Sequence, residues 1–309
     1  MAANIRIGTR GSQLAVWQAD FVTTALRKAR PDCNFERVII KTEGDRDQKS
    51  SLTRIGGQGV FTKAIEDALL EHNIDIAVHS LKDLPSQMTE GLMLGAVPRR
   101  ASVKDVLVTR KGKTLRDLKE KARIATGSIR RRCQLLRQRP DLEMVDLRGN
   151  IDTRLRKLQD NDFDALIMAH AALIRLALQK VQYQPFEINE MIPAVGQGAI
   201  GIQVRVADEK TRDIVQAVNH EPAMQAVTAE RAYLRRLDSG CQFPVGALAE
   251  IHNNTIELNG FVSNHDGSRW LQAEQAGPVE SAEQIGVKLA EQLIDRGALD
   301  ILHAFKHNT

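Results

Sequence analysis

The sequence predicts an α/β protein, and two observations carry this prediction. Short apolar runs alternate with amphipathic helical stretches over most of the chain. After about residue 220 the pattern changes to consecutive strands with turn signals, which is typical of a separate small α+β domain. A chain of 309 residues is long enough for two or three domains.

The α/β part contains a series of short segments with the apolar content of strands. We expect strands over residues 5–9, 35–41, 75–78, 93–97, 106–108, 123–125, 143–146, 165–168 and 200–205. The stretches between them have helical spacing. Ser12 is the expected N-cap of a helix that carries Leu14, Trp17, Phe21 and Leu26. Thr114-x-x-Asp117 and Ser281-x-x-Gln284 resemble capping boxes.

The last part of the chain is predicted as a helix, a small antiparallel sheet and a second helix. The helix is expected over 223–236, and strands over 248–251, 255–262 and 270–275. Asn253-Asn254 and Asp266-Gly267 are turn signals between these strands. The closing helix is expected over 282–296.

The composition is that of an ordinary globular protein, with 42% hydrophobic and 27% charged residues and a net charge of +4. No apolar run reaches the length of a membrane span, and the N-terminus lacks the pattern of a signal peptide. Cys33, Cys133 and Cys241 are too far apart for a CxxC metal site and argue against a disulfide framework. We therefore expect a cytoplasmic protein with no metal.

The arginines carry more information than the net charge. Arginine outnumbers lysine by nearly two to one, and one stretch is crowded with Arg123, Arg130, Arg131, Arg132, Arg137, Arg139, Arg148, Arg154 and Arg156. A guanidinium group binds carboxylates and phosphates through two parallel hydrogen bonds, which lysine cannot do. This pattern predicts an anionic ligand.

Chemically active side chains follow the predicted strands, where open α/β sheets bind their ligands. Arg10 and the helix start at Ser12 follow the first strand and would suit a carboxylate. The alternative is a plain turn with a surface arginine.

Ser80, Lys82 and Asp83 follow residues 75–78 together, and Asp83 could stabilise a cation or move a proton. A solvated salt bridge before a turn is the alternative there.

The same arrangement occurs twice more. Thr126, Ser128, Arg130 and Arg131 follow the strand at 123–125, and Arg148 and Arg154 follow the strand at 143–146. One arginine cluster fits a solvated helix face, but repeated clusters at strand ends favour ligand binding.

Three loops are rich in glycine or proline. Gly56-Gly57-Gln58-Gly59 and Gly196-Gln197-Gly198 fit a hinge or a close backbone contact, and neither matches a nucleotide-binding motif. Cys241 lies in the loop Ser239-Gly240-Cys241-Gln242-Phe243-Pro244, where it is either an inert buried thiol or a reactive one. The sequence identifies no histidine partner for a Cys-His hydrolase, and we interpret Cys33 and Cys133 as structural.

Taken together, these motifs resemble the porphobilinogen deaminase family, also called hydroxymethylbilane synthases. The matching segments occur in the family's order over nearly the whole chain. They are Gly8-Thr9-Arg10, Ser12-Gln13-Leu14-Ala15, Val78-His79-Ser80-Leu81-Lys82-Asp83-Leu84-Pro85, Ser128-Ile129-Arg130-Arg131, Leu147-Arg148-Gly149-Asn150, Thr153-Arg154-Leu155, Ala194-Val195-Gly196-Gln197-Gly198-Ala199, Ala229-Glu230-Arg231 and Gly240-Cys241-Gln242.

The resemblance implies three domains. The first two would resemble a periplasmic-binding-protein pair around a cleft, and the third would be a small α+β domain with the cysteine loop. Domain 1 is expected over 1–98 and 198–218, domain 2 over 102–193 and domain 3 over 221–309.

The resemblance also implies a transferase of haem and tetrapyrrole biosynthesis. It would condense four porphobilinogen molecules with loss of ammonia on a covalent dipyrromethane cofactor, and then release hydroxymethylbilane. Asp83 would be catalytic, and a thioether to Cys241 would anchor the cofactor. The implied cofactor-binding residues are Ser80, Lys82, Asp83, Thr126, Ser128, Arg130 and Arg131. The implied substrate-binding residues are Arg10, Ser12, Gln18, Arg148, Arg154 and Arg175.

Several positions depart from the family's pattern. Gln58 stands where lysine is usual, Glu43 where a neutral or basic residue is usual, and Gly127 where a second hydroxyl residue is common. Ala172 replaces a usual glycine. The linker Ala101-Ser102-Val103-Lys104 lacks the usual acidic residues and proline.

Two other functions are alternatives to the enzyme. A non-catalytic protein that binds small anions would explain the arginines, but not Asp83 beside Lys82 or the domain with Cys241. A nucleic-acid binder is disfavoured by the small net charge and the 4% aromatic content. We expect porphobilinogen as the partner, no nucleic acid, no membrane and a monomer.

Overall fold

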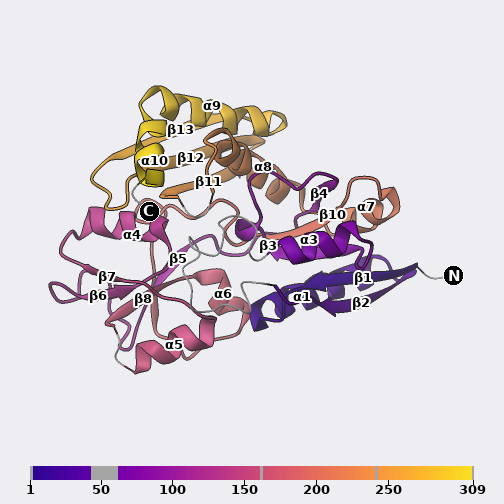
Figure 1. Ribbon diagram of the computed structural model, residues 1–309, viewed down its shortest axis with the longest axis horizontal. Helices are drawn as coiled ribbons and strands as arrows, with labels where there is room; N and C mark the ends of the chain where they lie inside the picture. Colours follow the sequence, from indigo (N-terminus) through magenta and orange to yellow (C-terminus); the bar gives the residue numbers. More distant parts are fainter. Residues whose placement is uncertain (1–2, 43–61, 161–162, 241–242, 308–309) are drawn as a thin grey trace. The chain divides into compact units, whose positions relative to one another are not determined.

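The protein is described by a computed structural model that covers residues 3–42, 62–160, 163–240 and 243–307. It divides into two compact units, Met1–Ala101 with Gly198–Gln225, and Ser102–Gln197 with Ala226–Thr309. The chain therefore leaves the first unit near residue 101 and returns to it near residue 198. Figure 1 shows the helices and strands of both units, coloured along the sequence.

The first unit is built on a mixed sheet of order β2-β1-β3-β10-β4. Its strands are β1 (Ala3–Thr9), β2 (Cys33–Ile39), β3 (Ile76–Ser80), β4 (Leu92–Ala96) and β10 (Ile200–Arg205). β1 runs parallel to β2 and β3, whereas β10 is antiparallel to β3 and β4. The returning chain thus supplies the strand that joins β3 to β4.

Helices cover both faces of this sheet. Ala19, Val22 and Leu26 of α1 (Gln13–Ala29) pack on one face, where α7 (Glu209–Gln216) also contributes buried residues. On the other face, Ile65 and Leu69 of α3 (Lys63–Leu70) pack against Ala77. A short 3₁₀ helix, η1 (Leu81–Asp83), follows β3. The predicted N-cap is confirmed, because the Ser12 hydroxyl accepts a hydrogen bond from the Ala15 N–H at 3.3 Å.

The second unit contains a sheet of order β7-β6-β8-β5-β9. Its strands are β5 (Asp105–Thr109), β6 (Arg123–Ala125), β7 (Glu143–Val145), β8 (Ala165–Ala169) and β9 (Tyr183–Pro185). Leu135 of α4 (Ile129–Gln138) packs on one face. Leu158 of α5 (Ile151–Gln159) and Leu173 of α6 (His170–Arg175) pack on the other.

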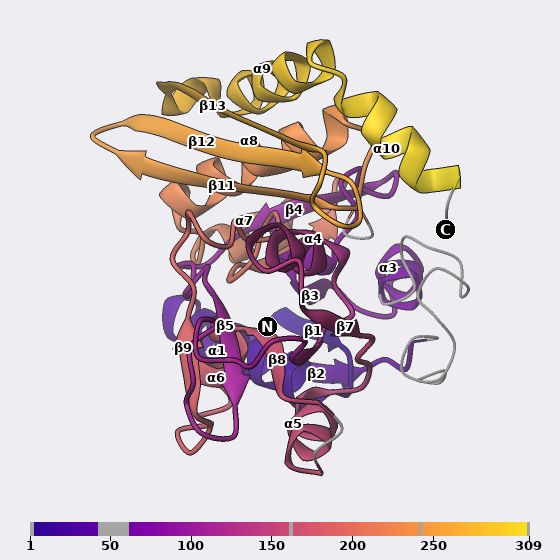
Figure 2. The same cartoon turned by 90° about the vertical axis from the view of Figure 1, so that its left-hand side faces the viewer.

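The same unit carries an antiparallel sheet of β11 (Val245–His252), β12 (Thr255–Ser263) and β13 (Trp270–Pro278). Three helices share its core: α8 (Glu221–Arg236), α9 (Ala282–Asp295) and α10 (Ala298–His307). A 3₁₀ turn, η2 (Val279–Ser281), precedes α9. Figure 2 shows the three long strands with α9 running beside them.

The α/β class and the α+β character of the last part are confirmed. The strands at 123–125 and 200–205 have the predicted bounds, and the other predicted strands differ at their ends by up to three residues. β9 and α10 are not predicted from the sequence. The prediction of two capping boxes is wrong. The Asp117 carboxylate accepts hydrogen bonds from the Thr114 N–H and hydroxyl within a turn that starts no helix, and the Ser281 side chain makes no capping hydrogen bond.

Candidate active site

In the first unit, the predicted site residues follow two neighbouring parallel strands. Ile7 of β1 is paired with Ile76 of β3, so both strands end at the same edge of the sheet. Arg10 and Ser12 come directly after β1. Ser80 is the last residue of β3, and Lys82 and Asp83 lie in η1. The register therefore brings the two groups of side chains to one edge.

A small cavity of about 70 Å³ lies at this edge. Five predicted residues line it: Arg10, Ser12, Gln18, Ser80 and Asp83. The Gln18 Nε2 donates a hydrogen bond to the Ser80 Oγ at 2.9 Å, which links α1 to the end of β3. Asp83 is exposed, whereas Gln18 is buried. Lys82 is half-buried and does not line the cavity.

His79 also lines the cavity, although the sequence analysis assigns no role to it. Burial lowers the pKa of His79 to about 4; the charge of Arg10 lowers this pKa further, and Gln203 opposes the shift. Its Nε2 makes no hydrogen bond of normal geometry with a described residue. The imidazole is therefore neutral near pH 7. Its place directly before Ser80, inside the quoted motif, is the signal that could have identified it.

In the second unit, the predicted residues again gather at one sheet edge. β6 runs parallel to both β7 and β8, so the three strands end on the same side. Residues from three segments follow them: Thr126, Ser128, Arg130 and Arg131 after β6, Arg148 and Arg154 after β7, and Arg175 after β8. The predicted repeat of polar residues at strand ends is therefore present in the fold.

Arg130 and Arg131 are not on a solvated helix face. Both side chains are buried and contact Asp105, the first residue of β5. Asp105 itself is fully buried, and no role is predicted for it from the sequence. An acidic residue at the start of an apolar strand is the signal that could have identified it.

The other arginines at this edge have distinct surroundings. The Arg154 Nε donates a hydrogen bond to the Gly149 carbonyl at 2.8 Å, and Asn150 caps α5 through the Thr153 N–H at 3.0 Å. Arg148 is half-buried. Burial lowers the pKa of Arg175 to about 10, and this side chain is 8% exposed, so it is held as a cation with little access to water.

The arginine-rich stretch does not form one anion-binding cluster. Arg139 forms two hydrogen bonds of 2.7 Å to Asp141, and Arg137 lies over the Trp270 ring at 4.6 Å. These contacts stabilise the fold, so the interpretation of the whole stretch as a ligand site is too broad.

Cys241 lies outside the described residues, as do Glu43 and Gln58. The described residues on either side of Cys241 make contacts within the protein. The Phe243 N–H donates a hydrogen bond to the Gly240 carbonyl at 3.0 Å, and the Phe243 and Phe305 ring centroids lie 5.6 Å apart. The other two cysteines are buried, and burial raises the pKa of Cys133 to about 12. This agrees with their interpretation as structural residues.

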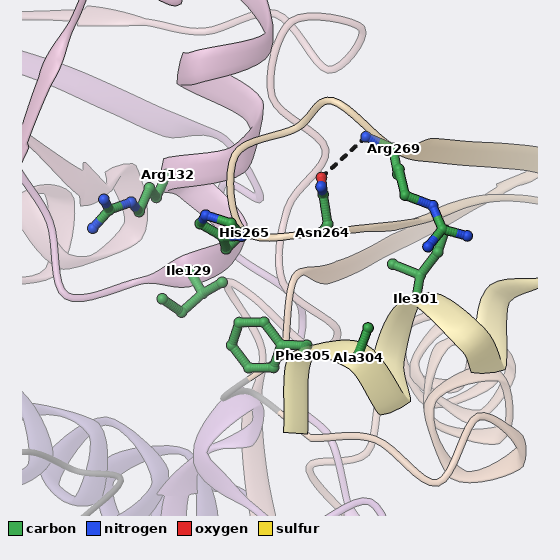
Figure 3. A pocket seen from close by; sticks show the side chains of 8 residues that line it. All are labelled: Ile129, Arg132, Asn264, His265, Arg269, Ile301, Ala304 and Phe305. Carbon is green, nitrogen blue, oxygen red and sulfur yellow. Dashed lines mark hydrogen bonds between the residues drawn. The ribbon is translucent and has the colours of Figure 1, made fainter. Parts of the chain in front are cut away.

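A larger pocket of about 430 Å³ lies in the second unit, between α4, α10 and the loop that joins β12 to β13. Its lining includes Ile129, Phe305, His265 and Arg269, together with Arg132 of the arginine-rich stretch, and none of the residues predicted to bind cofactor or substrate. Figure 3 shows the ring of Phe305 directed toward Ile129, while the Arg132 guanidinium points away from the pocket. The pocket is therefore mainly apolar and separate from the predicted residues.

Within the described ranges, no group of three or more histidine, cysteine or acidic side chains is placed to hold a metal ion. Among the described helices, none combines the length and apolarity needed to cross a membrane.

Comparison with protein-family models gives two matches along the chain. Residues 5–213 match the model described as "Porphobilinogen deaminase, dipyromethane cofactor binding domain", and residues 224–295 match "Porphobilinogen deaminase, C-terminal domain". The chain belongs to the porphobilinogen deaminase family. It is therefore an enzyme, a transferase of tetrapyrrole biosynthesis, and the predicted hydroxymethylbilane synthase function and dipyrromethane cofactor are confirmed at the level of the family. The non-catalytic anion-binding alternative is not favoured.

Curated relatives agree over the full length. The porphobilinogen deaminase of Pelotomaculum thermopropionicum is 46% identical over 98% of this chain and 97% of its own length. That of Moorella thermoacetica is 46% identical over 98% and 96%, and one from Chlorobium phaeobacteroides is 45% identical over 98% of both chains.

Solved structures give a weaker likeness. The periplasmic aliphatic sulphonate binding protein SsuA from Escherichia coli is 16% identical, with a TM-score of 0.43, over 76% of this chain and 70% of that one. The arginine-binding protein STM4351 from Salmonella typhimurium is also 16% identical, with a TM-score of 0.40, over 70% of this chain and 92% of that one. Similarity at this level has no weight for function.

Proposed function

We propose that this enzyme joins porphobilinogen units with Asp83 as its catalytic carboxylate. One observation carries the proposal: Asp83 lines a cavity with Arg10, Ser12 and Gln18 at the shared edge of β1 and β3. A group that stabilises positive charge thus lies beside groups that bind carboxylates. Porphobilinogen needs both, because it has acetate and propionate side chains and an aminomethyl group that leaves as ammonia.

Asp83 would act at the pyrrole N–H of the substrate. Loss of ammonia leaves positive charge on the pyrrole ring, and a nearby carboxylate lowers the energy of that charge in the transition state. The same carboxylate can accept the ring proton and return it. Asp83 is suited to this because η1 fixes its backbone directly after the buried strand β3.

The side chains of the substrate would be held by hydrogen bonds to cations and hydroxyls. The substrate-binding residues that we propose are Arg10, Ser12, Gln18, Arg148, Arg154 and Arg175. Each charged hydrogen bond to a carboxylate contributes about 1.5–3 kcal/mol when it is shielded from water. Arg175 is the most shielded of the three in the second unit.

The residues present fit a dipyrromethane that has several carboxylates. Thr126, Ser128, Arg130 and Arg131 supply hydroxyls and guanidinium groups at the end of β6, and Ser80 and Lys82 supply donors at the end of β3. Cys241 would anchor the cofactor through a thioether. When bound, the cofactor would supply the nucleophilic pyrrole carbon to which the first substrate is joined, so the thiol itself needs no catalytic base.

The remaining expectations belong to the same proposal. We expect domains at 1–98 with 198–218, at 102–193 and at 221–309. We also expect a cytoplasmic monomer that does not bind nucleic acid.

Asp83→Asn tests the catalytic assignment. The variant should keep the covalent dipyrrole, seen as added mass on the denatured chain, and lose most of its turnover of porphobilinogen. Asp20→Asn is the matched control, because Asp20 is an exposed carboxylate on α1 that pairs with Arg37. Near-normal turnover of Asp83→Asn would remove Asp83 from the mechanism.

Cys241→Ser tests the anchor separately. This variant should lack the added mass, while Cys33→Ser should retain it, because Cys33 lies at the start of β2. A dipyrrole mass that remains on Cys241→Ser would place the attachment elsewhere.

A further inference from the structure

Asp105 lies in a buried network with Arg130 and Arg131. The Asp105 Oδ2 accepts a hydrogen bond from the Arg130 Nη2 at 2.8 Å. The Oδ1 accepts two from Arg131, from Nε at 3.0 Å and Nη2 at 2.7 Å. The side chains are 0% exposed for Asp105, 4% for Arg130 and 8% for Arg131. The carboxylate thus fixes the planes of both guanidinium groups.

Two backbone carbonyls and the Gln197 side chain also make hydrogen bonds within this network. The Nη1 groups of Arg130 and Arg131 donate to the carbonyls of Ile192 and Ile167 at 2.7 and 3.1 Å. Gln197 donates through its Nε2 to the Asp105 Oδ1 at 3.1 Å. These acceptors orient the cations, but the carbonyls and the amide carry no formal charge. One carboxylate therefore faces two cations among the described contacts.

The first unit contains a comparable network with equal numbers of acids and arginines. Asp75 contacts Arg6 at 3.0 Å and Arg205 at 3.4 Å, as Asp105 contacts two arginines. There, however, Arg205 also contacts Asp208 at 2.7 Å. Two carboxylates thus face two guanidinium groups, and the Arg6 side chain is 38% exposed to water.

The difference matters because a buried charge is costly unless an opposite charge compensates it. Burial lowers the pKa of Arg130 and the charge of Arg131 lowers it further, while Asp105 opposes both effects, so one shared carboxylate does not fully compensate the buried cation. Within the part of the chain that the structure describes, two cations at this site face one anion. A bound anion would supply the missing charge.

We propose that Asp105 is a positioning residue that orients Arg130 and Arg131 and leaves one net buried positive charge for a carboxylate of the dipyrromethane. This rests on the proposed function, in which these two arginines hold the cofactor. Asp105 does not touch the reacting atoms in this role. Asp105 instead sets the orientation of the Arg130 and Arg131 guanidinium groups and the net charge that they present to the cofactor.

The test is the rate at which the full-length chain, purified without cofactor, gains the covalent dipyrrole mass when porphobilinogen is added. We expect Asp105→Asn to gain this mass at least about tenfold more slowly than the unmodified chain, because misdirected binding groups lose this much or more. Asp75→Asn is the matched control: it also removes the carboxylate between two arginines, and its loading rate should stay within about twofold. Thermal unfolding of both variants confirms that they are folded.

The outcomes separate the two proposals. A folded Asp105→Asn chain that loads at the unmodified rate overturns the role of Asp105. If Arg131→Gln also loads at that rate, the proposed role of the arginine pair fails as well. If Arg131→Gln is slow while Asp105→Asn is not, only the inference about Asp105 fails.

A second variant decides the question if Asp105→Asn does not fold. Asp105→Glu keeps the negative charge and lengthens the side chain by one CH₂ group, so the carboxylate meets the two guanidinium groups at a different position. We expect a folded chain with slower loading, because Arg130 and Arg131 are then redirected while their ion pairs are kept. Loading at the unmodified rate by folded Asp105→Glu would overturn the proposal.

Discussion

The Glu230 carboxylate accepts a hydrogen bond from the backbone N–H of Gly196, with 2.7 Å between Oε2 and N. Its other oxygen accepts one from the Ala249 N–H at 3.0 Å. Glu230 lies on α8 and is fully buried, whereas Gly196 lies in the glycine-containing loop and Ala249 in β11. One carboxylate therefore joins three segments of the second unit, which gives the Ala229-Glu230-Arg231 motif a structural role.

Glu230→Gln should destabilise the protein by about 1–3 kcal/mol, because an amide has one acceptor oxygen and leaves a buried N–H without its partner. Urea unfolding measures this free energy. Glu283→Gln is the control, since Glu283 forms an exposed ion pair with Arg235 and should change stability by less than about 0.5 kcal/mol. An unchanged unfolding midpoint for Glu230→Gln would contradict the role assigned to Glu230.

His79 should make stability depend on pH below about 6.5, the ordinary histidine pKa. Its folded pKa is about 4, so the unfolded chain binds more protons between these values and unfolding becomes easier as the pH falls. The effect is at most about 1.4 kcal/mol per pH unit. Unfolding free energies at pH 7 and pH 5 measure it.

His79→Asn provides the comparison for this effect. The loss of stability between pH 7 and pH 5 should be smaller in the variant, because asparagine does not titrate. Equal losses in both proteins would show that His79 is not buried in its neutral form.

Gly286 should tolerate no side chain. A Cβ at this position would lie 2.2 Å from the Ala229 carbonyl oxygen, so α9 approaches the backbone of α8 directly. Gly286→Ala should lower stability by about 1–3 kcal/mol through overpacking. In the control Gly277→Ala, the nearest atom is the end of the Ile285 side chain at 3.2 Å, which can move. Melting temperatures that fall equally in the two variants would contradict this explanation.

Gly127→Ser should also be unfavourable, although a hydroxyl residue is common at this position in the family. The new Cβ would lie 2.8 Å from the Leu147 carbonyl oxygen, which belongs to the backbone. We expect a lower melting temperature than for Ser128→Ala, because the Ser128 side chain does not cap α4. A more stable Gly127→Ser variant would show that the Leu147 backbone moves without cost.

The sequence predicted most of the α/β fold because the buried strands are short apolar runs between helical patterns. β9 was missed because Tyr183–Pro185 is mostly exposed at the edge of its sheet and has no apolar run. The chemistry at the strand ends was predicted because parallel strands bring their following loops to one edge.

The partners of the predicted arginines could not be identified from the sequence. Asp105 lies 25 residues before Arg130 and 92 before Gln197, and only the pairing of β5 within its sheet brings them together. For the same reason, the stretch from Arg123 to Arg156 could not be divided into ligand-binding and structural arginines. That division depends on single contacts such as Arg139 with Asp141.

The position of β10 determines the order in which the first unit can form during synthesis. β3 and β4 do not pair with each other, and both pair with β10, which follows them by about a hundred residues in the chain. In a nascent chain that ends before Ile200, β3 and β4 therefore lack the strand that joins them, while residues 102–197 already include every described strand of their own sheet. The strands of the inserted sheet are thus available for pairing on the ribosome before those of the first unit are complete.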